Sequence, residues 1–450
     1  MIGGSAVLVL LLCSSTVYST EPETTTNTNA LPEENGSSFE HMECLQGDSL
    51  TNPVLEEVKE QIRRGERDFS VNLIKSLFKD GNQTETGEET NIFISPSSIY
   101  QALTLSHFGA RGKTKDDLEA VMGMTGISSI DVMKNYLFDK AFQSIRERNP
   151  ELGYNLTHAN KFYFNRDLSL DPCLQKVLSE EMEATDFSNS NKATRIINSW
   201  VERKTNKKIR DLIPSGSLDG STKVALVNAA YFKGEWESRF NMSESKKDNF
   251  YTRRDKIAIT KFMKQKGKFN YYVSEELRAH ILELPYKGEQ VSMLIILPPF
   301  EEGSLQKTIN LLSPETFQGV IAEVKSGFYQ IDDLSIKIPK FRIEESYNLG
   351  NTLGDLGVQS LFAADSDLSG FLADKSNEVK LNRAIHKAFI EVNEEGTEAA
   401  ASTAIFAFRS ASPLFHKNFN ADHPFLFMIY DKEADVILFF GVYQNPDPSA

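Results

Sequence analysis

Cysteine, tryptophan and long apolar runs are all scarce in this sequence. Its 450 residues contain three cysteines and two tryptophans. Cys13 lies in the first apolar segment, which leaves Cys44 and Cys173, too few for a disulfide framework. Cys44 and Cys173 could equally well be two unpaired thiols or form one disulfide between the tail and the body of the protein. The fold must therefore be stabilised by core packing, for which a hydrophobic content of 40% is sufficient.

No segment after residue 19 is long and apolar enough to cross a bilayer, and the C-terminus carries no retention tetrapeptide. Residues 1–19 hold no charged side chain, and their apolar run, Ala6 to Cys13, is too short for a membrane anchor. We interpret residues 1–19 as a secretory signal peptide cleaved after Ser19, so the protein is expected to be secreted and extracellular. Four glycosylation sequons fit that compartment: Asn35, Asn82, Asn155 and Asn241.

Positive charge is absent from residues 20–50, which hold seven acidic residues and no Lys or Arg. Such a composition predicts a disordered acidic tail over residues 20–55. The net charge of −14 argues against nucleic acid as a partner. For the one basic cluster a solvated helix end fits better than a glycosaminoglycan site, because Glu202 and Asp211 interrupt it. The cluster consists of Arg203, Lys204, Lys207, Lys208 and Arg210.

Motifs of catalysis are also missing. There is no G-x-S-x-G nucleophile elbow and no H-E-x-x-H zinc helix. The stretch "GARGKTK" ends like a phosphate loop, but the required first glycine is His107, so we interpret it as a helix-breaking turn. His386 and His423 lie among apolar residues and are expected to be hydrogen-bonded core residues. No histidine or cysteine spacing suits a metal, and we expect no catalytic residue and no cofactor.

Hydrophobic periodicity predicts helices mainly early in the chain and strands mainly late. Residues 67–80, 97–122 and 193–213 have helical patterns, the second broken at Gly109 and Gly112 and the third running into a loop. Residues 224–232 are strand-like, and two hairpins are predicted over residues 280–298 and 425–443. The class is therefore α+β with large sheets. No linker divides the chain after residue 55, so residues 56–450 are predicted to form a single domain.

One connector is unusual. Residues 391–415, "EVNEEGTEAAASTAIFAFRSASPLF", join two strand-like runs, yet the segment is long and contains only one glycine and one proline. Read as a strand, one face carries Thr397, Ala399 and Ala401 and no charge, while Glu398 lies on the other face with Ala400. The segment could therefore be buried in a sheet although its position is that of a loop.

This connector resembles the reactive-loop hinge of inhibitory serpins. Other blocks resemble the family in the same order, from about residue 60 to residue 447. These blocks are "NIFISPSSIYQALTLSHFGARGKT", "INSWVERKTNKKIRDLI", "ALVNAAYFKGEWESRF", "LGVQSLFAADSDLSGF" and "NADHPFLFMIYD". The acidic tail and the loop are most similar to insect haemolymph serpins that restrain melanisation or immune protease cascades.

The resemblance implies a serpin fold with three β-sheets, about eight or nine helices and an exposed reactive loop. It also implies a monomeric suicide inhibitor, not an enzyme, that forms a covalent acyl complex with an extracellular serine protease. The cleaved loop would then insert into the central sheet. The hinge would consist of Glu394, Gly396, Thr397, Glu398, Ala399, Ala400 and Ala401. The shutter and breach of that sheet would consist of Ser95, Ser97, Ser98, Asn228, His386 and Trp236.

The reactive bond departs from the commonest family spacing, which would place Ser410 before the scissile bond. We predict cleavage at Arg409-Ser410, because Arg409 can make a charge-assisted contact with a trypsin-like pocket. Phe408-Arg409, a chymotrypsin-type bond, and Ser410-Ala411, an elastase-type bond, stay open. A non-inhibitory carrier or binding module is the alternative function. The hinge favours inhibition, since its inserting face has neither proline nor a bulky charge.

Overall fold

The computed structural model describes residues 53–79, 90–147, 149–374, 379–396 and 417–446. These residues all belong to one compact unit, Ser38–Ala450. The predicted signal peptide and residues 20–52 of the predicted tail lie outside the described residues, so both assignments stay predictions. The first described helix, α2 (Glu56–Lys79), begins where the folded domain was predicted to start.

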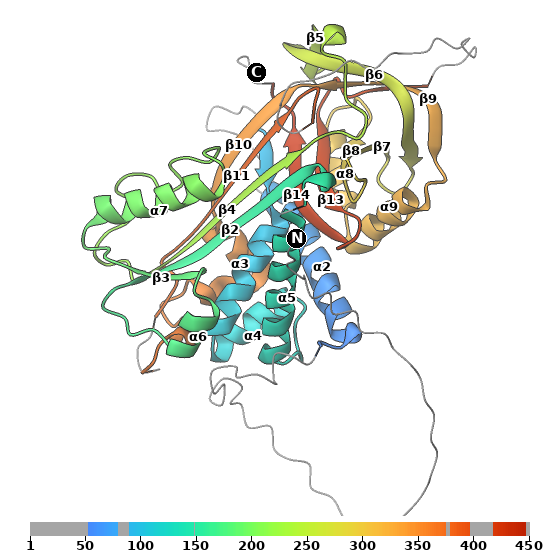
Figure 1. The fold of residues 1–450 in the computed structure, drawn as a ribbon. Coiled ribbons are helices and arrows are strands. Elements are labelled where there is room, and N and C mark those ends of the chain that lie inside the picture. The colour runs from blue at the N-terminus through green and yellow to red at the C-terminus, as the bar shows by residue number, and fades with distance from the viewer. Residues whose placement is uncertain (1–52, 80–89, 148, 375–378, 397–416, 447–450) are drawn as a thin grey trace, which may run out of the picture. The chain divides into compact units, whose positions relative to one another are not determined.

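A five-stranded sheet runs through the centre of the described structure (Figure 1). Its strand order is β10 (Phe341–Asn348), β11 (Arg383–Val392), β4 (Val224–Gly234), β2 (Tyr154–Asn165) and β3 (Met182–Thr185). β4 and β11 form a parallel pair, whereas their outer neighbours, β2 and β10, pair with them antiparallel.

Each face of this sheet is covered by a helix. On β4, alternate residues such as Val227 and Tyr231 pack with α7 (Ser190–Lys204) in one apolar cluster. The intervening residues, such as Leu226, belong to a second cluster that contains α3 (Pro96–Gly109). Both sets are apolar because β4 is buried on both faces, which explains why its sequence is a continuous hydrophobic run.

The other described strands form a single nine-stranded sheet. Its order is β1 (Ile92–Ile94), β14 (Val436–Tyr443), β13 (Phe425–Asp431), β8 (Val291–Leu297), β7 (Ala279–Pro285), β6 (Lys256–Ser274), β9 (Gln330–Pro339) and β12 (Lys417–Asn420), with β5 (Lys246–Arg253) paired to β6. Three sheets were expected. β6, with 19 residues, is long enough to pair with β5 at one end and β7 at the other, so it joins two strand groups into one sheet.

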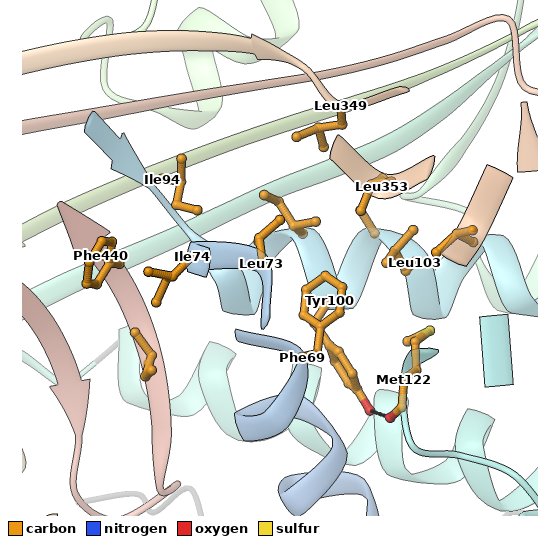
Figure 2. Close-up of a cluster of buried hydrophobic side chains, with 14 of the residues drawn as sticks. Phe69, Leu73, Ile74, Ile94, Tyr100, Leu103, Met122, Leu349, Leu353 and Phe440 are labelled. Atoms are coloured by element: carbon orange, nitrogen blue, oxygen red, sulfur yellow. Dashed lines mark hydrogen bonds between the residues drawn. The ribbon is translucent and has the colours of Figure 1, made fainter. Parts of the chain in front are cut away.

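The helices α2, α3, α4 (Gly112–Val121) and α5 (Ser129–Glu147) pack below the central sheet in Figure 1. Both α2 and α5 contact α3, and α4 follows α3 after a short break. Figure 2 shows the core between them, where Phe69 and Leu73 of α2 face Leu103 of α3. The Tyr100 hydroxyl in this core donates a hydrogen bond of 2.9 Å to the Met122 carbonyl. A buried polar atom thus has a partner in otherwise apolar packing.

α3 begins at a well-formed cap. The Ser95 side chain accepts a hydrogen bond from the Ser98 backbone, and Pro96 occupies the first turn, where it needs no amide donor. All residues of α3 except Gln101 are buried. This helix is therefore apolar on most of its circumference, as expected of a helix inside a domain.

The remaining described helices are short or lie at the periphery. They are α6 (Pro172–Val177), α8 (Ser304–Leu311), α9 (Pro314–Ser326) and α10 (Leu349–Leu353). Short turns of helix occur at Pro150–Leu152, Met242–Glu244, Gly354–Val358, Gln359–Leu361 and Ser369–Phe371. Within the described ranges, no helix has the length and hydropathy needed to span a membrane.

The sequence-based elements agree with this architecture in type. The pattern over residues 97–122 becomes α3 and α4, and both predicted hairpins are present as β7–β8 and β13–β14. The stretch over residues 193–213, predicted as a helix that runs into a loop, has this form, and its helix ends at Lys204. Beyond it the backbone of Asn206 and Lys207 has positive φ, which a helix cannot accommodate.

Candidate functional site

The described part of the connector forms a tight turn immediately after β11. The Asn393 backbone donates a hydrogen bond of 2.8 Å to the Gly396 carbonyl, and the Asn393 side chain accepts one of 3.0 Å from Glu395. Gly396 is also bridged to Glu235, just beyond the end of β4. The chain therefore leaves β11, reverses direction and arrives beside the end of β4.

Gly396 is required by this geometry. Its φ of +147° is a conformation that L side chains rarely adopt. A Cβ placed on it would lie 1.9 Å from the Gly234 carbonyl oxygen, so the two backbones approach as closely as glycine allows. The predicted hinge glycine thus has a steric role at the start of the connector.

Trp236 holds the turn in place through two hydrogen bonds. Its backbone nitrogen donates to the Glu395 carbonyl and its indole nitrogen donates to the Asn393 carbonyl, both at 2.9 Å. The indole ring also stacks on Tyr286 with a centroid separation of 4.6 Å. Trp236 and Glu394, predicted together from the resemblance, are therefore adjacent at the end of β4.

Glu394 carries a buried charge. Its side chain is 1% exposed and forms ion pairs with Lys340 at 2.8 Å and Lys261 at 3.7 Å. Burial alone would raise the pKa of Glu394, but Lys340 and the neighbouring Ser245 hydroxyl outweigh it and hold the pKa below its usual range. An ionised carboxylate in this position ties the turn to β6 and to Lys340, which follows β9.

The parallel ladder between β4 and β11 ends before either strand does. Its last pair is Phe389 with Tyr231, although β11 continues to Val392 and β4 continues to Gly234. Over these last residues each strand pairs only with its outer neighbour, β10 or β2. The centre of the sheet is therefore already unpaired at the end where Gly396 lies.

A buried polar network holds the same two strands together farther down. His386 pairs with Asn228 in the ladder, three residues below its open end. The His386 ring is hydrogen-bonded to the Asn228 side-chain oxygen, and its Nε2 accepts from the Ser95 backbone at 3.1 Å. Asn228 in turn donates to the Ser98 carbonyl at 2.9 Å and to the Ser98 hydroxyl at 2.8 Å. The N-terminus of α3 thus clamps β4 to β11.

His386 is neutral in this setting. Burial lowers its pKa to about 3, with a smaller contribution from nearby His158. Since Nε2 accepts the Ser95 amide, the ring proton lies on Nδ1 and is donated to Asn228. The expectation that His386 is a hydrogen-bonded core residue is confirmed, and His423 likewise contacts Asp422 and the Pro298 carbonyl.

Asn160 belongs to this network and was not predicted. It lies opposite Asn228 on β2, is 9% exposed, and donates to the Ser98 carbonyl at 3.3 Å. An asparagine just before the aromatic stretch "FYF" of the strand is the signal that could have indicated it. Ser97, in contrast, is buried outside the network and lies against Glu66 of α2.

Several predicted positions lie outside the described residues. They are Thr397, Glu398, Ala399, Ala400, Ala401, Arg409 and Ser410 in the connector, the sequons Asn35 and Asn82, and Cys44. Of the other sequons, Asn241 is exposed and Asn155 is partly buried on β2. The pairing of Cys44 with Cys173, the reactive bond and all glycosylation stay predictions. Among the described residues no cluster of His, Cys, Asp and Glu is suited to a metal ion.

The comparisons with known proteins agree with this geometry. A family model described as "Serpin (serine protease inhibitor)" matches residues 64–446. The chain belongs to the serpin family. The predicted fold class is therefore confirmed, whereas the assignment of the Gly396 turn to the hinge of a reactive loop stays a prediction.

Relatives of this serpin include proteins named as inhibitors. "Serine protease inhibitor 88Ea" of Drosophila melanogaster is 31% identical over 400 residues, which cover 85% of this chain and 90% of the relative. "Leukocyte elastase inhibitor" of Homo sapiens is 34% identical over 396 residues, covering 86% and 100%. Among solved structures, human thyroxine-binding globulin complexed with its hormone matches with a TM-score of 0.74, 27% identity and coverage of 86% and 99%.

Proposed function

We propose that this serpin is a secreted suicide inhibitor of trypsin-like serine proteases, acting in an extracellular cascade such as an immune or melanisation cascade. The protease serine would attack the carbonyl carbon of Arg409, and the bond to the Ser410 nitrogen would break. The protease then stays attached as an ester of Arg409, while the Ser410 nitrogen takes up a proton and leaves with the C-terminal peptide.

The observation that carries the proposal is the open end of the β4–β11 ladder. Gly396 is bridged to Glu235 beside the unpaired ends of both strands. Once cut, the segment that starts at Thr397 could enter this opening without a change of direction, with Thr397, Ala399 and Ala401 on one face. The acylated protease would be carried along and distorted before its ester is hydrolysed.

The hydrogen-bonded network of Ser95, Ser98, Asn228 and His386, here called the clamp, would oppose insertion of a new strand between β4 and β11. For the strand to advance, the contacts of His386 with Asn228 must be exchanged for contacts with the new strand. Because the participating groups are buried, leaving them unpaired would cost about 1–3 kcal/mol each. The clamp therefore keeps the intact protein closed until cleavage supplies the inserting strand.

A matched pair of variants tests the mechanism. Thr397→Arg places a guanidinium on the face predicted to be buried, whereas Glu398→Arg places it on the face predicted to stay in water. With trypsin, wild type and Glu398→Arg should form complexes that survive detergent, and Thr397→Arg should be cleaved as a substrate. Equal complex formation by both variants would contradict the assignment of faces, and absence of a complex with trypsin, chymotrypsin and elastase would contradict inhibition.

A carrier function is the second candidate, and the similarity to thyroxine-binding globulin favours it. In a carrier, loop cleavage need not be followed by insertion. Mass spectrometry of the peptide released by each protease would identify the cleaved bond, and the melting temperature after cleavage separates the two functions. An inhibitor of chymotrypsin- or elastase-like proteases would be recognised by a peptide starting at Arg409 or Ala411.

A further inference from the structure

Two adjoining cavities lie between α2, α5 and the central sheet. The larger has a volume of about 280 Å³ and the smaller about 120 Å³. Six residues line both and mark the place where they meet: Ile62, Glu66, Gln101, Asn135, Asp139 and Gln143. Five polar side-chain atoms of the residues in these walls are shielded from solvent and have no hydrogen-bond partner: Glu66 Oε1, His158 Nε2, Glu181 Oε2, Arg146 Nε and Tyr154 Oη.

Three of these atoms, Glu66 Oε1, His158 Nε2 and Glu181 Oε2, are acceptors, whereas Arg146 Nε is a donor. His158 contacts the Gln101 side-chain oxygen through Nδ1 at 3.1 Å, so that nitrogen carries the proton and Nε2 has only a lone pair. Burial lowers the pKa of His158 to about 4, which keeps the ring neutral. The Ser97 hydroxyl lies beside the Glu66 carboxylate, but no donor reaches the Oε1 atom of Glu66. Each buried acceptor costs free energy until a donor reaches it.

The cations in the wall of the larger cavity already have partners. Arg146 pairs with Asp431 at 2.6 Å, and both Lys59 and Arg63 pair with Glu56 at 3.1 Å. Asp139 accepts a hydrogen bond of 2.8 Å from the Asn135 amide, and positive charge reaches both acids, from Arg67 at Glu66 and from Arg63 and Lys59 at Asp139. Burial outweighs these charges and raises the pKa of Glu66 to about 7 and that of Asp139 to about 6, so the protein compensates the two carboxylates only in part.

Aromatic rings and cations line the exposed side of the larger cavity, where the Lys59 ammonium lies 5.6 Å from the centre of the Phe138 ring and the Arg146 guanidinium 5.5 Å from that of Phe142. Phe138 and Phe142 of α5 stack on each other at 6.4 Å and are 59% and 36% exposed. Deeper in, Leu156 and Leu438 line the wall. An apolar body would fit between these side chains, while a group with several N–H donors would reach the acceptors behind them.

We propose that these cavities form a binding site for a small primary amine, whose ammonium contacts Glu66 and Asp139 and whose aromatic or apolar body occupies the larger cavity beside Phe138 and Phe142. A carboxylate ligand would be repelled by the same two acids. A neutral ligand would leave Glu66 Oε1 with a weaker donor.

Calorimetric titration of the intact protein with three ligands of one shape tests the site: 2-phenylethylamine, 2-phenylethanol and 3-phenylpropionate. The amine should bind at least tenfold more tightly than the alcohol, and the carboxylate should bind most weakly. Glu66→Gln should abolish the preference for the amine, whereas Glu57→Gln, on the exposed side of α2, should leave it intact.

Gln143→Trp supplies a second test that leaves Glu66 in place. A bulky indole at the junction should block binding of the amine while the melting temperature stays within a few degrees. The site would be refuted by equal affinities for the three ligands, by no binding of the amine, or by amine binding that both Glu66→Gln and Gln143→Trp leave unchanged. These measurements use no protease, so their failure would not bear on inhibition.

Discussion

Acidification should destabilise this serpin through two buried histidines. Burial lowers the pKa of His386 to about 3 and that of His158 to about 4, against 6.5 in the unfolded chain. Both rings are therefore neutral in the folded protein at pH 5 but protonated in the unfolded chain. Their contribution to stability is fully present above pH 6.5 and falls as the pH decreases from there toward the folded pKa values.

The size of the effect follows from the two pKa values. A pH of 5 lies about 1.5 units below the pKa of the histidines in the unfolded chain, and each unit corresponds to about 1.4 kcal/mol in the free energy of unfolding. Each ring should therefore cost about 2 kcal/mol at pH 5 relative to pH 7.5. For a protein whose total stability is on the order of 10 kcal/mol, the two together are a large fraction.

Urea unfolding at pH 7.5 and pH 5 would measure this loss. Carboxylates also titrate over part of this range, so the informative quantity is the difference between wild type and His158→Gln. The variant should lose about 2 kcal/mol less than wild type between the two pH values. The imidazole NMR signals of His386 and His158 should also stay constant from pH 8 to pH 5. A ring that titrates above pH 6, or a variant with the wild-type loss, would refute the reasoning.

Three further predictions concern the reactive loop. Protein cut in the loop should melt far above intact protein, because insertion adds backbone hydrogen bonds; equal melting temperatures in calorimetry would favour the carrier function. Arg409→Ala should lower the rate of trypsin inhibition on the order of 30- to several-thousand-fold, since losing one partner of a buried charge pair costs about 2–5 kcal/mol; unchanged inhibition, with a released peptide that starts at Ala411, would contradict it. Gly396→Ala should destabilise the protein by about 1–3 kcal/mol in urea unfolding, because its Cβ would meet the Gly234 oxygen at 1.9 Å. The control is Gly220→Ala, whose Cβ would have no atom within 3.4 Å. An equal loss of stability in the two variants would show that the turn can rearrange to accept a side chain.

The hairpins were predictable because turn residues separate runs that suit strands. β14 has the bounds expected from "VILFFGVY", and β13 extends one residue beyond "FLFMIY", to Asp431. The start of α2 was missed by about eleven residues, because Gly65 interrupts the apolar stripe. That glycine packs on the Met122 backbone, a contact made by tertiary structure that no local pattern reveals.

The candidate site was likewise predictable from the sequence only in part. Alternation along the connector and the position of Gly396 were visible in the sequence, whereas the grouping of Trp236 with Glu394 came from family resemblance. Glu66 went unnoticed because it lies in a charged stretch, "RRGERD", and Asn160 because a polar residue beside Lys161 in a strand has no evident role until its neighbours are known. Their partners lie on other elements, so only the fold brings them together.

The direction of the chain at Gly396 has a consequence for the whole sheet. Because the turn reverses the chain after β11, a strand that starts at Thr397 would run antiparallel to β11, and also antiparallel to β4, which is parallel to β11. Its arrival would replace the parallel pair at the centre with two antiparallel pairs, and antiparallel pairing is slightly more stable per residue. Successive residues that enter would bond alternately to β4 and to β11, so the new strand would be hydrogen-bonded along both edges. Each further residue would therefore add backbone hydrogen bonds that must be broken before the strand can leave, so insertion would be effectively irreversible.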